Sequence, residues 1–402
     1  MLRFVSLSLI MLCRPCLAAD ARLDALRSSL IAMRGKAPDA GGSRGATPQL
    51  TVVKHQLRDW VESRLAALKP RGNEGVLQRK LNVELRAAGL ICGGAHEPCL
   101  SDTGMGFLEN LTFRQTGGFL ILQTGVSIEC GSDESAYVYT WSSEGWKRVW
   151  QTEQNTYTEK DYKPQTIDGV HVSPFSQTND YVVLTLGTEW WCMSGWHRVY
   201  YRVFRLGPDA EALTLVDGEE FAYVAGHDPP IQGSVTTDDV LVEFAVSSID
   251  AAVHSREAIR HFTIDHDEVE RVDPFALSPR DFVDEWLTHD WREAAFWSED
   301  DQRRSMADWH KKLHKEFVAG QFIYPTMHCT DKPDLWEVGV DLSDPPTPWD
   351  QKPKGTYFLV RWPPPYHFSM VQVNDKPTAG CSEEDRRLDD ERHTLFPVQE
   401  WR

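Results

Sequence analysis

The sequence predicts an α+β protein that is mainly antiparallel β, with helices near both ends. Apolar residues recur at helical spacing in the N-terminal part, alternate with a period of two from about residue 111, and return to helical spacing after Asp273. We expect three blade-like repeats in the middle, arranged as a small or incomplete β-propeller. A β-sandwich is the alternative architecture.

The first nineteen residues have the pattern of a secretory signal peptide. Arg3 precedes a short apolar run over residues 4–12, and Leu17-Ala18-Ala19 offers small residues for cleavage. No later apolar run reaches the roughly 20 residues that a membrane-spanning helix needs. The sequence therefore predicts a secreted or periplasmic protein, with residues 1–19 as signal peptide and no membrane span.

Three N-terminal segments carry apolar residues at helical spacing. They cover residues 20–34, 53–65 and 77–88, and Gly89 is a typical helix stop. Residues 35–50 are rich in Gly, Pro, Ala and Ser, which is typical of a linker. We therefore expect a helical N-terminal segment over residues 20–90.

Alternation predicts the strands of a second domain, residues 91–275. The expected strands are 119–128, 136–141, 146–151, 181–186, 198–206, 213–216, 240–245, 259–264 and 269–272. Three stretches begin alike, with Phe119-Leu120-Ile121-Leu122, Tyr181-Val182-Val183-Leu184 and Val240-Leu241-Val242, at a period of about 60 residues. Four short antiparallel strands per repeat is the content of a propeller blade.

Residues 276–402 form an expected C-terminal helical and β module. Ser278-Pro279 is a good helix start, and a second helix is expected over 301–317. Strands are expected at 335–340, 357–362 and 368–373.

Six cysteines follow the signal peptide, and an even count in an exported chain favours disulfides. We expect three pairs: Cys92–Cys99, Cys130–Cys192 and Cys329–Cys381. No CxxC pair occurs after residue 19, which argues against a zinc ribbon and against thioredoxin-like redox chemistry.

The chain is strongly acidic. Its formal net charge is −18, and loss of the two signal-peptide arginines makes it −20. Such a charge repels phosphate backbones and anionic headgroups, so we expect no nucleic-acid partner.

The catalytic and cofactor signatures that a sequence can show are absent. The one GxSxG match, Gly41 to Gly45, lies in the expected linker rather than on a strand-to-helix turn, so it is not a nucleophile elbow, and there is no P-loop and no GxGxxG. His310 and His314 lie one helical turn apart, a spacing that can bind zinc, but the Glu of a zinc-protease helix is missing and a solvated helix face is favoured. We expect no metal and no cofactor.

The densest unusual segment is the loop over residues 187–197, which contains three tryptophans and a carboxylate. Such a loop suits stacking on a sugar or anchoring a protein partner, although packing between sheets also accounts for it. If the repeats are real, loops of the other copies share its face. The ligand-binding candidates are therefore Glu129, Glu189, Trp190, Trp191, Trp196, Asp250 and His254.

These observations favour a non-catalytic exported binding or scaffold protein, with a glycan or an envelope protein as the partner considered. A secreted hydrolase acting on glycan or ester substrates is the alternative, resting on the tryptophan-rich loop and its nearby carboxylates.

Overall fold

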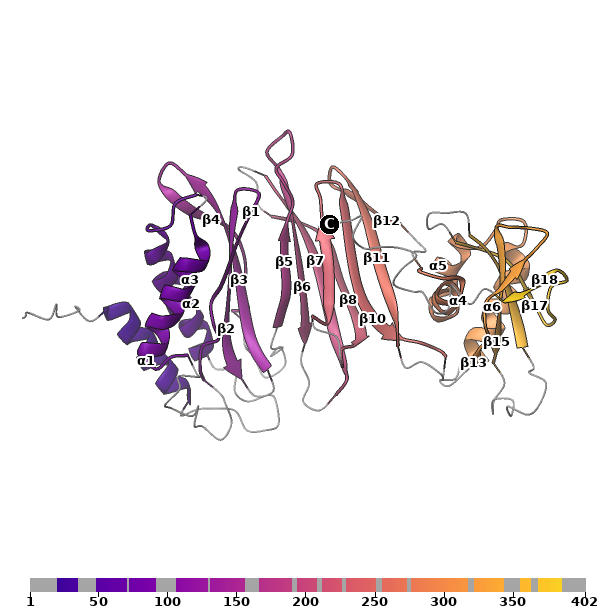
Figure 1. Ribbon diagram of the computed structural model, residues 1–402, viewed down its shortest axis with the longest axis horizontal. Helices are drawn as coiled ribbons and strands as arrows, with labels where there is room; N and C mark the ends of the chain where they lie inside the picture. Colours follow the sequence, from indigo (N-terminus) through magenta and orange to yellow (C-terminus); the bar gives the residue numbers. More distant parts are fainter. Residues whose placement is uncertain are drawn as a thin grey trace, which may run out of the picture. The chain divides into compact units, whose positions relative to one another are not determined.

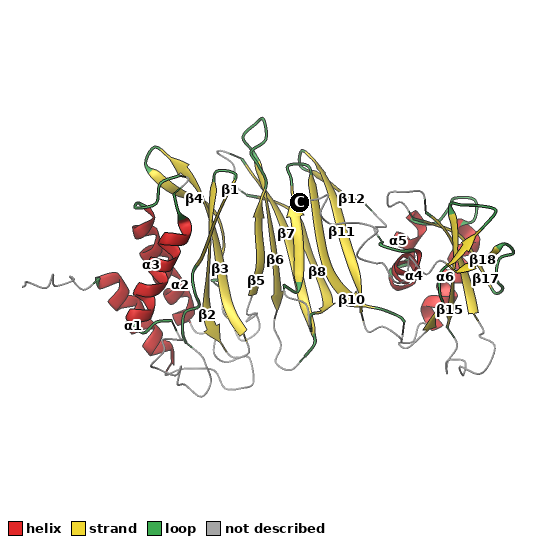
Figure 2. Cartoon of the chain, viewed as in Figure 1, coloured by secondary structure: helices red, strands yellow, loops and turns green. Residues whose placement is uncertain are grey.

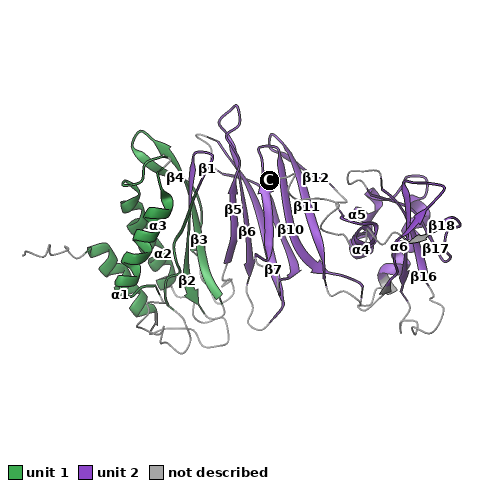
Figure 3. Ribbon diagram, viewed as in Figure 1, with its two compact units in different colours: residues 1–114, 122–162 green, residues 115–121, 163–402 purple. Residues whose placement is uncertain are grey.

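A computed structural model gives the structure of the chain (Figure 1). It describes residues 20–34, 48–70, 72–91, 106–128, 131–155, 166–189, 194–207, 212–225, 229–250, 255–272, 276–316, 322–342, 355–362 and 368–384. These residues form two compact units (Figure 3): residues 1–114 with 122–162, and residues 115–121 with 163–402. The four-part division expected from the sequence stays a prediction.

The first unit combines three helices with most of a four-stranded sheet. The helices are α1 (Ala21–Arg34), α2 (Pro48–Leu65) and α3 (Glu74–Ala87). The sheet has the order β1 (Thr112–Thr116), β2 (Phe119–Ile128), β3 (Gly131–Ser142) and β4 (Gly145–Thr152).

Local signals set the ends of α3 and tie it to the sheet. The Asn73 side chain accepts a hydrogen bond from the Val76 N–H at the helix start, and Gly89 adopts a positive φ of 71° just after its end. The Asn82 amide exchanges two hydrogen bonds with the Leu111 backbone, of 2.8 and 3.0 Å. The buried side chain of Asn82 on α3 therefore provides hydrogen-bond partners for the backbone N–H and carbonyl groups of Leu111, just before β1.

The second unit begins with two antiparallel meanders that share one eight-stranded sheet. The first comprises β5 (Thr166–Val172), β6 (Tyr181–Glu189), β7 (Trp196–Leu206) and β8 (Leu213–Tyr223). The second comprises β9 (Ile231–Val235), β10 (Asp239–Ser247), β11 (Ser255–Asp265) and β12 (Glu268–Arg271). Strands β8 and β10 pair at Ala222 and Val246.

One hydrophobic core joins the two meanders. Alternate residues of β6, β7, β10 and β11 point into it, including Leu184, Val203, Val242 and Phe262. Tyr200 and Tyr201 each pack over a glycine, on opposite faces of the sheet. A Cβ at Gly187 would be only 1.9 Å from the Tyr200 hydroxyl, and a Cβ at Gly218 would be only 2.1 Å from the Tyr201 ring. The two neighbouring tyrosines therefore mark the outer and inner faces of β7.

The rest of the second unit packs helices on a six-stranded sheet. The helices are α4 (Pro279–Thr288), α5 (Trp291–Phe296) and α6 (Arg303–Glu316). The strands are β13 (Phe322–Ile323), β14 (Met327–Cys329), β15 (Leu335–Asp341), β16 (Gly355–Arg361), β17 (Ser369–Asn374) and β18 (Cys381–Glu384). Helix α4 begins as expected, with Ser278 as N-cap and Pro279 in the first turn. Its apolar side packs on β15 and β16 around the fully buried Trp286.

The coarse fold class is confirmed: the chain is a β-rich α+β protein whose sheets are mostly antiparallel (Figure 2). The elements expected from sequence correspond to α1–α4, α6, β2–β4, β6–β8, β10–β12 and β15–β17. Among the described residues, no helix is long and apolar enough to cross a membrane.

A disulfide joins Cys329 of β14 to Cys381 of β18, the third pairing expected from the sequence. Both residues are buried beside Leu335 and Leu359. The other four cysteines, Cys92, Cys99, Cys130 and Cys192, lie outside the described residues.

Replacing both Cys329 and Cys381 by alanine is expected to lower the free energy of unfolding by about 4 kcal/mol, because the bridge closes a loop of 52 residues in the unfolded chain. Urea unfolding of the oxidised protein and of the variant measures the difference. The single variant Cys329→Ala under the same oxidising conditions also lacks this bridge, so it is the control and should match the double variant. A loss below about 1 kcal/mol would contradict the expectation.

Candidate functional site

The outer face of β7 and β8 carries a cluster of aromatic side chains. Trp196 pairs with Tyr223 across the two strands, and their ring centroids are 4.9 Å apart. Phe221, two residues before Tyr223, lies almost parallel to the Trp196 ring at 5.9 Å and is 60% exposed. Residues two apart on a strand share a face, so these three rings form one partly exposed surface, called here the aromatic face.

Charged side chains border the aromatic face. Arg198 lies next to Trp196 on the same side of β7, with its Nη1 2.6 Å from a Glu219 oxygen and its Nε 3.9 Å from a Glu189 oxygen. Further along, Arg202 Nε donates to Asp217 at 2.7 Å. Arg198 and Glu219 both remain about half exposed, so water or a ligand can still reach them.

This combination has a definite chemistry. Aromatic rings present flat apolar surfaces, while neighbouring carboxylates accept and guanidinium groups donate hydrogen bonds. Ligands with apolar faces and many hydroxyl groups match both parts, and sugars have that character. The tyrosine, tryptophan and arginine content is also that of binding hot spots.

The sequence-predicted candidates fall in three places. Glu189 and Trp196 both lie beside Arg198 at one end of β6 and β7, so the structure brings these two candidates together. Asp250 is elsewhere: its side chain is buried and forms a salt bridge with Arg280 at the start of α4. The other candidates, Glu129, Trp190, Trp191 and His254, lie outside the described residues.

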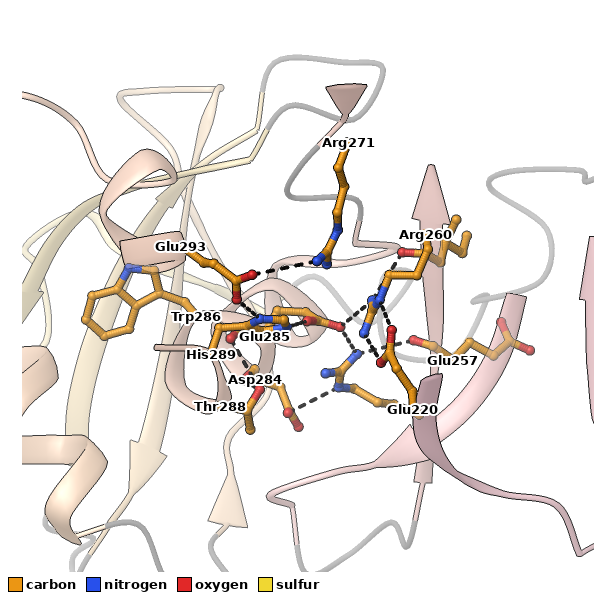
Figure 4. A network of polar contacts seen from close by, with 12 residues as sticks. Glu220, Glu257, Arg260, Arg271, Asp284, Glu285, Trp286, Thr288, His289 and Glu293 are labelled. Carbon is orange, nitrogen blue, oxygen red and sulfur yellow. Dashed lines mark hydrogen bonds and ion pairs between the residues drawn. The ribbon is translucent and has the colours of Figure 1, made fainter. Parts of the chain in front are cut away.

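A buried network of charges involves the inner faces of β8 and β11 (Figure 4). Arg256 and Arg260 of β11 are in phase with core residues and are 6% and 4% exposed. Glu285 of α4 contacts both guanidinium groups through one oxygen, at 2.8 and 3.3 Å. Glu220 of β8 holds Arg260 by two parallel hydrogen bonds of 2.7 Å, the strong bidentate arrangement.

Two further carboxylates extend this network. Asp284 lies 3.2 Å from Arg256 Nε and also accepts hydrogen bonds of 2.9 Å from the Ser248 hydroxyl and the Ile249 N–H. Glu293 of α5 lies 3.8 Å from Arg271 of β12. The network therefore links β8, β11, β12 and the end of β10 to α4 and α5.

His289, the residue after α4, completes the network. Its Nε2 is 2.5 Å from a Glu285 oxygen, and its Nδ1 contacts a Glu293 oxygen. Burial lowers the pKa of His289, but hydrogen bonds and attraction from Glu285 and Glu293 outweigh it and raise the pKa above the usual value of 6.5. Burial raises the pKa of Glu285, yet Arg256 and Arg260 hold that pKa well below its ordinary range.

Sequence reasoning missed this network, although β11 carries a signal for it. Along that strand the inward positions are occupied by Arg256, Ala258, Arg260, Phe262 and Ile264. Arginines in phase with core residues predict buried charge that needs carboxylate partners.

The expectation of a solvated helix face is wrong for His310, whereas His314 is exposed. His310 is 3% exposed, and its Nε2 lies 3.1 Å from the carbonyl oxygens of both Trp286 and His289. His314 Nδ1 is 3.2 Å from the Leu287 carbonyl oxygen. The two imidazoles thus cap the last carbonyl groups of α4, which lack partners within the helix. In the described part of the chain, no group of three or more His, Cys, Asp or Glu is placed to hold a metal ion.

No family model matches this chain, and no curated protein matches it. Solved structures that resemble it include a BT0996 RGII complex, with 8% sequence identity, a TM-score of 0.24, and coverage of 68% of this protein and 74% of the matched one. A similarity at that level does not establish a shared fold, so nothing about that protein is carried over.

Proposed function

We propose that this chain is an exported, non-catalytic binding protein that takes a neutral glycan on the aromatic face. The observation that carries the proposal is the Trp196–Phe221–Tyr223 cluster, partly exposed on a sheet face and bordered by charged side chains. Export is supported by the N-terminal residue pattern and by the Cys329–Cys381 disulfide.

The charges around the rings favour a neutral ligand. Both arginines of the face have carboxylate partners, Arg198 with Glu219 and Arg202 with Asp217, so no excess positive charge awaits an anion. The whole chain has a formal net charge of −18, which repels anionic polymers. Hydroxyl groups can instead bond to the exposed oxygens of Glu219 while a sugar ring stacks on Phe221.

The repeat predicted from the sequence provides the scaffold in this proposal. Strands β1–β4, β5–β8 and β9–β12 are three successive antiparallel groups of four, the strand content of a blade, and the last two groups are joined into one sheet by the β8–β10 pairing. The aromatic face then belongs to the last two strands of the second group.

Phe221→Ala is expected to weaken glycan binding at least about tenfold, because truncation of an exposed stacking ring removes roughly 1.4 kcal/mol or more. A glycan array identifies the ligand, and calorimetry with that ligand measures the affinity. Phe296→Ala is the matched control, since Phe296 of α5 is 84% exposed and lies off the aromatic face, and it should bind like the wild type.

Three outcomes contradict the proposal. An array with no binding, or equal affinity for the Phe221 and Phe296 variants, removes the aromatic face as a glycan site. Turnover of chromogenic glycosides or esters that is lost in Glu189→Gln establishes the hydrolase alternative instead.

A further inference from the structure

The contacts of His289 define a proton-dependent arrangement. Each of its ring nitrogens faces a carboxylate oxygen, Nε2 facing Glu285 and Nδ1 facing Glu293. A carboxylate only accepts hydrogen bonds, so both contacts are satisfied only when both nitrogens carry protons. A neutral imidazole has one lone pair directed at one of the two carboxylates.

The elements around His289 supply charges of both signs. Helix α4 contributes Asp284 and Glu285, α5 contributes Glu293, β8 contributes Glu220, β11 contributes Arg256 and Arg260, and β12 contributes Arg271. His310 of α6 faces the His289 carbonyl oxygen. With a protonated His289, these four carboxylates are balanced by three guanidinium groups and one imidazolium. Loss of that proton removes one positive charge from this largely buried cluster, in which Asp281 of α4 also attracts Arg256.

We propose that His289 is a proton-sensitive latch: its protonated ring fastens α4 to α5 and completes the ion network that ties these helices to strands β8, β11 and β12. The latch closes when His289 binds a proton and loosens when the proton leaves. It acts on the helices and does not depend on the glycan proposal.

The direction of the pH dependence follows from linkage. The folded protein holds the His289 proton more tightly than the unfolded chain, because its folded pKa is raised above 6.5. The latch therefore contributes its full stabilisation below pH 6.5, and this contribution is lost as the pH rises through the folded pKa. His310 has the opposite sign, because burial and the nearby His314 lower its pKa. Comparison with a His289 variant separates the two.

The test measures urea unfolding from pH 5.5 to 9 in the wild type, His289→Gln and His328→Gln. His289→Gln should lose the extra stability that the wild type shows at acidic pH and approach the wild type at high pH. His328 is the control histidine, since its ring contacts the Pro333 carbonyl oxygen, and its variant should retain the wild-type pH profile. Hydrogen exchange should quicken in α4 and α5, relative to β6 and β7, as the wild type passes through the transition.

A direct titration protects the test against a variant that fails to fold. Nuclear magnetic resonance of the histidine rings should show His289 titrating above pH 6.5, and Glu293→Gln should lower that value and identify the resonance. Titration of His289 at or below 6.5, or a pH profile in His289→Gln identical to the wild type, overturns the latch.

Discussion

Replacing Glu285 with alanine is expected to lower the free energy of unfolding by about 3–5 kcal/mol, because the change leaves buried guanidinium groups without their shared carboxylate. Arg256 and Arg260 both contact one Glu285 oxygen, and both are almost inaccessible to water. Asp284 and Glu220 remain as partners, but each reaches one arginine. The loss of stability comes mainly from leaving buried guanidinium charge without a counter-charge in a region of low dielectric constant, and less from the loss of one contact.

Glu299→Ala is the matched control for this experiment. Glu299 also accepts a hydrogen bond from an arginine, Arg361, at 2.7 Å, but both side chains are about one-third exposed. Water replaces the lost partner there, so the expected cost is about 0–1 kcal/mol. Urea unfolding with unchanged slope measures both variants. Equal losses in the two would contradict the view that burial decides the effect.

Most of the long helices and strands can be predicted, because apolar residues recur along each of them with the period of a helix or of a strand. Strand β2 was expected at 119–128 and occupies Phe119–Ile128, and helix α4 begins at the predicted Ser278 cap. The missed strands lack a strong apolar alternation: β1 reads Thr-Phe-Arg-Gln-Thr, and β9 contains a glycine. Such segments become strands because adjacent strands of the sheet form hydrogen bonds with them, and this pairing cannot be seen in a short stretch of sequence.

The sequence predicts the types of residue at the candidate site, but it does not predict which side chains contact one another there. The tryptophans of residues 187–197 predict a binding loop, yet the rings that accompany Trp196 are those of Phe221 and Tyr223, about 25 residues later. Strand register brings them together, and register depends on the whole sheet. The repeat predicts that Asp250 lies near Glu189, but the Asp250 carboxylate forms a salt bridge with Arg280 inside the fold.

The second large effect is expected in the helical part of the second unit, at Trp286. Its ring is fully buried among His310, Phe358 and Trp291, at centroid distances of 4.8, 6.0 and 6.4 Å, and its Nε1 donates to the Ser298 hydroxyl at 3.1 Å. Trp286→Ala should cost about 3–5 kcal/mol, since the neighbouring rings are held by separate elements and cannot close the cavity.

Trp286→Phe distinguishes the cavity from the hydrogen bond. Phenylalanine retains most of the ring volume and loses the Nε1 donor, so its expected cost is about 1–3 kcal/mol. Urea unfolding compares the two variants, and equal losses would assign the effect to the hydrogen bond. Glycan affinity of the folded variants should match the wild type, because Trp286 belongs to the core around α4 whereas the aromatic face lies on β7 and β8. Loss of affinity at a temperature where Trp286→Phe remains folded would contradict this expectation and show that the two regions are coupled.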